Sequence, residues 1–217
     1  MKMFEDYQKK LLNSISQATE WHSRDKTPRP FIVKLHDATR LHYDFRLGFA
    51  GVLISWVLPE GPCLDATLER LAIRVDDHAI NKGFEGVIPD DRYGAGPTMV
   101  WDEGFWITDQ NIDDALRAGQ LHFQLEGQKL KRSWTLTRLR YCSGRTQEEW
   151  VLRKMLDIEA RSFAEYDIVV EQCRSVRTRR NIEEVARGVR SLMPGRRPRR
   201  KTRDPNQLLL FADDLGS

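Results

Sequence analysis

The sequence predicts a mainly β protein, and three observations indicate this fold class. Segments between residues 31 and 157 alternate apolar and polar side chains with a period of two, the spacing of strands that bury one face. Gly, Pro and Asp interrupt these segments at short intervals, as turns between antiparallel strands do. Hydrophobic residues make up 40% of the 217-residue chain, enough for the core of an ordinary domain. An all-β sandwich and a β-barrel both fit this pattern.

The expected elements follow one another closely along the chain. Asn111 and Gly119 are placed to begin and end one internal helix, over 111–119. Glu126 and Gly127 are expected at the turn of a hairpin. The expected strands cover residues 31–36, 42–47, 51–58, 70–78, 98–107, the two arms of the hairpin in 121–140, and 148–154.

Composition divides the chain into four segments. Residues 1–28 form a polar lead-in, 29–157 the β domain, 158–192 a helical or mixed extension, and 193–217 a disordered basic tether. Between residues 174 and 203, twelve arginines and lysines stand against two glutamates, whereas the rest of the chain is mildly acidic. Such an arm suits nonspecific contact with DNA phosphates, and a solvated linker is the alternative.

Several protein classes do not fit the composition. The longest apolar run, 47–59, is too short for a membrane helix, and the charged start lacks the apolar core of a signal peptide. Cys63, Cys142 and Cys173 are odd in number and form no CxxC pair, which argues against a disulfide scaffold or a zinc finger. We therefore expect a soluble cytoplasmic protein.

One strand carries the residues that indicate chemistry. Alternation in 42–47 places His42, Asp44 and Arg46 on one face, and His36 ends the preceding strand. Two imidazoles and a carboxylate are a plausible ligand set for Mn, Fe, Co or Zn, and the Arg46 fork suits a phosphate or carboxylate. Two alternatives are a solvated polar face and the facial triad of an iron oxygenase, with His36 or His78 as the distal histidine.

Five segments, in this order, resemble the 3′-phosphoesterase module of bacterial DNA ligase D and its stand-alone relatives. They are FIVKLHDATRLHYDFRL, GVLISWVLPEGPCLD, RLAIRVDDH, FEGVIPDDRYGAG and MVWDEGFW. The resemblance implies a compact β-barrel, to which composition and pattern add short flanking helices and a flexible basic C-terminal arm. It also implies a bacterial, Mn²⁺-dependent hydrolase that removes 3′-terminal ribonucleotides and 3′-phosphates from DNA, so that the 3′-hydroxyl can be ligated in end joining. Such an enzyme would be associated with the nucleoid when bound to DNA.

The same resemblance implies roles for individual residues. The metal ligands fall on His36, His42 and Asp44. Arg46, Arg70 and His78 are the implied phosphate contacts, and Arg46 and His78 the implied catalytic residues.

Four positions depart from the pattern of the family. Glu60 and Ile54 stand where lysines are common, Lys82 where tyrosine is usual, and Lys34 where glutamine is frequent. The departures leave the preference between phosphodiester and phosphomonoester open. They also leave an alternative function, a non-catalytic adaptor for DNA ends or for the sliding clamp.

The C-terminal tail contains a short apolar peptide. Gln207, Leu208, Leu210 and Phe211 resemble the peptide by which bacterial repair proteins bind the sliding clamp. The alternative is that this peptide packs on its own domain. A DNA ligase and the end-binding Ku protein are further partners that the resemblance implies.

Overall fold

The structure is a computed structural model that describes residues 27–79, 83–140 and 147–188. Lys82, Cys142, most of the expected polar lead-in and the C-terminal peptide 207–211 lie outside these residues. Across the described parts of the chain, no helix is both long enough and apolar enough to cross a membrane.

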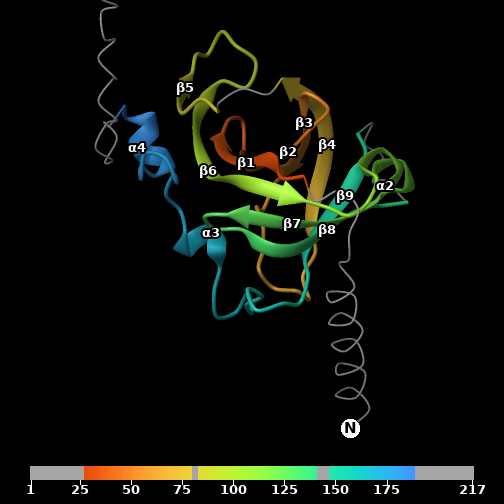
Figure 1. Ribbon diagram of the computed structural model, residues 1–217. Coiled ribbons are helices and arrows are strands. Elements are labelled where there is room, and N and C mark those ends of the chain that lie inside the picture. Colours follow the sequence, from red (N-terminus) through yellow and green to blue (C-terminus); the bar gives the residue numbers. More distant parts are fainter. Residues whose placement is uncertain (1–26, 80–82, 141–146, 189–217) are drawn as a thin grey trace, which may run out of the picture.

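Within the described residues, eight antiparallel strands close into a barrel (Figure 1). The order around the barrel is β1-β2-β3-β4-β9-β8-β7-β6, and β6 then pairs with β1, while the short β5 extends from β6. The mainly β prediction is confirmed. Because the pairing of β6 with β1 closes the sheet, the fold is a barrel and not a sandwich. The strands are β1 (Arg29–Asp37), β2 (Leu41–Phe49), β3 (Val52–Leu58), β4 (Arg70–Ala79), β5 (Gly86–Ile88), β6 (Gly96–Ile107), β7 (Gln120–Gly127), β8 (Lys131–Arg138) and β9 (Glu149–Lys154).

Aromatic side chains fill the barrel interior. On β2 the odd-numbered residues Tyr43, Phe45 and Leu47 are buried in the main core, as the alternation predicted. Phe45 packs against Trp56 and Phe123, with ring centroids about 6 Å apart, which are favourable distances for aromatic pairs. Because this face points into a packed core, the even-numbered residues of β2 must lie on the outer surface of the barrel.

The expected internal helix is present as α2 (Ile112–Ala118). The side chain of Asn111 accepts a hydrogen bond from the Asp114 backbone N–H and so caps the first turn. Gly119 ends the helix in the left-handed conformation, with φ of 77°, which favours glycine.

The expected helical extension packs onto the barrel. It contains two short helices, α3 (Ile168–Glu171) and α4 (Ile182–Ala186), whose buried residues Ile168, Ile182 and Val185 join the main core. Between them, Val176 joins a second, smaller buried cluster with Ile32, Leu53 and Val100. The described part of the extension therefore helps to cover the barrel.

Candidate metal centre

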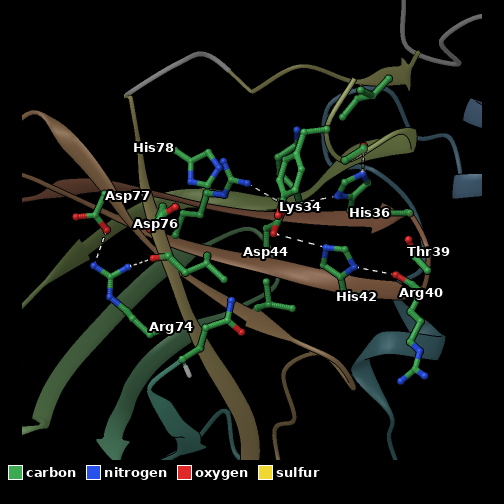
Figure 2. A pocket seen from close by; sticks show the side chains of 18 of the residues that line it. Lys34, His36, Thr39, Arg40, His42, Asp44, Arg74, Asp76, Asp77 and His78 are labelled. Carbon is green, nitrogen blue, oxygen red and sulfur yellow. Dashed lines mark hydrogen bonds and ion pairs between the residues drawn. The ribbon is translucent and has the colours of Figure 1, made fainter. Parts of the chain in front are cut away.

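A polar pocket of about 1150 Å³ lies on the outer face of β1 to β4 (Figure 2). Its β2 residues are the even-numbered ones, opposite to those in the core. The segment between β4 and β6 forms the other wall. The pocket lining includes Lys34, His36, His42, Asp44, Arg46, Arg74, His78, Phe84, Tyr93 and Gly94.

Three candidate metal ligands converge in this pocket. β1 and β2 are joined by a short turn, and their register places His36 directly opposite His42, with ring centroids 4.9 Å apart. The Asp44 carboxylate lies 4.0 Å from His36 Nδ1 and 3.7 Å from His42 Nε2. Ligand atoms of all three residues lie within 4.8 Å of one another, close enough to hold one ion.

Backbone carbonyls orient both imidazoles. His36 Nε2 lies 2.8 Å from the Gly94 carbonyl oxygen, and His42 Nδ1 lies 2.8 Å from the Arg40 carbonyl oxygen. Because a carbonyl only accepts, each of these ring nitrogens carries a proton, and the neutral form of each ring would offer His36 Nδ1 or His42 Nε2, which lie toward Asp44, as a ligand atom. Burial also lowers the pKa of His36, which favours the neutral ring that a metal requires. The donor set thus fits a divalent transition metal.

Arg46 lies beside the three ligands with part of its hydrogen-bonding capacity unused. One terminal nitrogen donates to Asp44 Oδ2 over 3.0 Å. The Arg46 Nε atom is buried and has no hydrogen-bond partner among the described residues. Buried donors are nearly always paired, so this N–H is suited to an anion bound in the pocket.

His78 reaches the same pocket from β4. Ser55 donates its hydroxyl proton to the Leu53 carbonyl over 2.8 Å, so its oxygen can accept from His78 Nδ1 at 3.3 Å. This contact leaves His78 Nε2 for a ligand. Burial, and then the positive charge of Arg46, lower the pKa of His78.

Arg70 does not join the other predicted site residues. It lies at the start of β4, pairs with the Glu60 carboxylate and has its guanidinium carbon 5.0 Å from the centroid of the Phe163 ring. It does not line the pocket, although its Nε is likewise buried and unpaired within the described part of the chain. The phosphate-binding role of Arg70 stays a prediction.

Arg74 also lines the pocket, although no role was predicted for it from the sequence. Its guanidinium donates to the Ser55 carbonyl over 3.1 Å and to the Asp77 carboxylate, and lies 5.3 Å from the centroid of the Trp56 ring. The Arg74 guanidinium is therefore engaged in contacts within the protein. Lys34 also lines the pocket, directly opposite Asp44 in the strand register.

The sequence analysis also missed the contribution of Gly94 and Ser55. Gly94 lies in the segment FEGVIPDDRYGAG, which resembles the family but was given no chemical role. That resemblance was the available signal for Gly94. No signal identified Ser55, whose partner His78 is 23 residues away in the sequence.

Comparison with known proteins points to one family. The model of the DNA ligase D 3′-phosphoesterase domain matches residues 34–138. A multifunctional non-homologous end joining protein LigD of Pseudomonas aeruginosa is 42% identical over 172 residues, which are 79% of this chain and 20% of that protein. The corresponding protein of Mycobacterium tuberculosis is 32% identical over 138 residues, or 63% of this chain and 17% of that protein. The chain therefore spans about one fifth of the length of these curated relatives.

Proposed function

The chain belongs to the DNA ligase D 3′-phosphoesterase domain family, and on this premise we propose that it heals DNA 3′ ends for non-homologous end joining. It would remove a terminal ribonucleotide or a 3′-phosphate and leave a 3′-hydroxyl. The observation that carries the proposal is the convergence of His36, His42 and Asp44 beside Arg46, whose Nε finds no partner within the described part of the chain.

His36 Nδ1, His42 Nε2 and an Asp44 oxygen would hold the metal, which we propose to be Mn²⁺. Imidazole with carboxylate suits several divalent transition metals, and among them the family resemblance favours manganese. A bound divalent ion polarises a phosphate oxygen and helps to orient the ester for in-line attack.

Arg46 and His78 would act on the phosphate itself. The free Arg46 Nε–H points a fixed positive charge at an oxygen whose charge changes during the reaction. With Nδ1–H held by Ser55, a protonated His78 can donate its Nε2 proton to the leaving oxygen. A bound phosphate anion favours this imidazolium, offsetting the effects that lower the pKa of His78 in the free protein.

The test uses two primer–templates, one ending in a single 3′-ribonucleotide and one in a 3′-phosphate, each with Mn²⁺ and with EDTA. We expect metal-dependent shortening or dephosphorylation that disappears in His42→Ala. His122→Gln is the matched control, because that histidine is also partly buried but does not line the pocket. Wild-type turnover in His42→Ala would rule out the ligand set. A folded protein that binds DNA without turnover would instead support the adaptor function.

A sliding clamp is the proposed partner of residues 207–211, and a DNA ligase and Ku are proposed to act on the same ends. Deleting residues 207–217 is expected to spare turnover on naked oligonucleotides and to abolish clamp binding, measured by pull-down with purified clamp. Equal clamp binding by the truncated protein would refute this role of the tail.

A further inference from the structure

Two exposed aromatic side chains border the pocket, and nothing in the proposed chemistry uses them. Phe84 is 56% exposed and Tyr93 is fully exposed, and both line the pocket. Both come from residues 83–95, the segment whose Gly94 carbonyl also contacts His36. Exposed rings forgo the free energy of burial, so two of them at one pocket rim indicate a contact surface.

The wall that carries these rings is anchored at both ends. Near Phe84, the Glu85 carboxylate accepts hydrogen bonds from the Val100 N–H, over 2.8 Å, and from the Ser175 hydroxyl. Next to Tyr93, the Gly94 carbonyl holds the metal-site residue His36 over 2.8 Å. The rings therefore project from a backbone that is fixed relative to the metal ligands.

The Phe84 ring is also supported from one side. It lies against Gly86, where an added Cβ would approach the ring to 2.6 Å. Gly86 has a φ of 154°, so both its backbone and the ring above it favour glycine. A ring supported on one side and exposed on the other is prepared to stack with little loss of side-chain entropy.

The pocket beside the rings is suited to a phosphate ester. Arg46 and Lys34 line it, and Arg46 offers an unpaired N–H. A nucleotide combines a phosphate with a flat base, and base–aromatic stacking together with cationic contacts is a common way of holding single-stranded ends. The cationic groups of the pocket and the exposed rings therefore fit the phosphate and the base of one terminal nucleotide.

We propose that Phe84 and Tyr93 form a stacking platform for the nucleobases at the DNA 3′ end whose phosphate ester enters the pocket. The inference rests on the proposed function and specifies how that site recognises its substrate. Because every base has a π-face, the platform would tolerate any terminal sequence but would require a base.

The experiment measures the affinity of the full chain for a fluorescent primer–template with a 3′-phosphate, by anisotropy in EDTA so that no turnover occurs. A second DNA has the same end with an abasic terminal nucleotide. We expect Phe84→Leu and Tyr93→Leu each to weaken binding of the base-containing end about tenfold. The variants should bind the abasic end as the wild type does, and Tyr93→Phe should keep wild-type affinity for both ends.

Phe105→Leu is the matched control, because Phe105 is 53% exposed but lies outside the pocket. Wild-type affinity of the two leucine variants for the base-containing end, or an equal loss on both ends, would overturn the platform. Turnover assays separate this outcome from failure of the proposed function. An inactive wild type that still discriminates the abasic end would refute the function alone, and an active enzyme indifferent to both substitutions would refute the platform alone.

Discussion

Glu85 connects the pocket wall to the C-terminal extension, and we expect its replacement to lower the free energy of unfolding. Its nearly buried carboxylate accepts from the Val100 N–H and the Ser175 hydroxyl, and lies 3.7 Å from an Arg180 terminal nitrogen. Glu85→Ala leaves these buried donors without their acceptor. Each of the two stranded donors costs about 1–3 kcal/mol, and loss of the longer ion pair to Arg180 adds to this cost. Since such contributions overlap, we expect a total loss of about 3–5 kcal/mol in the free energy of unfolding.

Glu85→Gln separates the loss of charge from the loss of the acceptor. The amide oxygen can still accept from Val100, so we expect a loss of about 1–2 kcal/mol. Glu69→Ala is the control, because Glu69 is 55% exposed and 4.0 Å from its partner Arg153, a geometry worth about 0.5 kcal/mol or less.

Urea unfolding followed by tryptophan fluorescence measures all three variants, since five tryptophans are buried in the barrel. A cost of less than about 1 kcal/mol for Glu85→Ala would show that the extension does not depend on this carboxylate. A cost for Glu85→Gln equal to that of Glu85→Ala would show that charge, and not the acceptor, dominates.

Two further predictions concern charged groups. Arg46→Ala should reduce kcat/KM on 3′-phosphate ends far more than Arg70→Ala, because Arg46 lines the pocket and Arg70 does not; equal losses would restore Arg70 as a direct phosphate contact. Burial lowers the pKa of His36, His78 and His122 below the usual 6.5, so the native state binds fewer protons than the unfolded chain. The free energy of unfolding should therefore keep its full value above about pH 6.5 and decrease as the pH falls through the lowered pKa values. A urea midpoint that stays constant from about pH 7.5 to 5 would contradict this expectation.

The grouping of His36, His42 and Asp44 could be predicted because it is local in the sequence. Strand alternation alone puts His42, Asp44 and Arg46 on one face, and the structure places all three in the pocket. A short turn after His36 brings that residue opposite His42. These relations need only a period of two and a tight connection between neighbouring strands.

Alternation was less informative on β4. Leu71, Ile73 and Val75 share one face in the sequence pattern, yet they are only half-buried, whereas Ala72 on the other face is completely buried. The β3–β4 register shifts at Leu53/Ser55, and alternation separates two faces without saying which one meets the core.

The pocket wall formed by residues 83–95 could not be predicted because contacts between distant segments hold it in place. Gly94 reaches His36 across 58 residues, and Ser175 reaches Glu85 across 90. Ser175 also lies beyond the residues 34–138 that match the family model. The pocket wall therefore depends on contacts from a segment outside the residues that the family model matches.

Because the His–His–Asp cluster and the aromatic wall are held by different contacts, substitutions should be able to change Mn²⁺ affinity and binding of DNA ends separately. The proposed metal ligands His36, His42 and Asp44 belong to one hairpin, and the Gly94 carbonyl in addition orients His36. The aromatic wall depends in addition on Glu85 and its partners in the extension. A substitution such as Ser175→Ala should therefore weaken binding of DNA ends while leaving Mn²⁺ affinity close to that of the wild type. Calorimetric Mn²⁺ titration beside end-binding anisotropy measures both, and a parallel loss of the two affinities would show that the site is one cooperative unit.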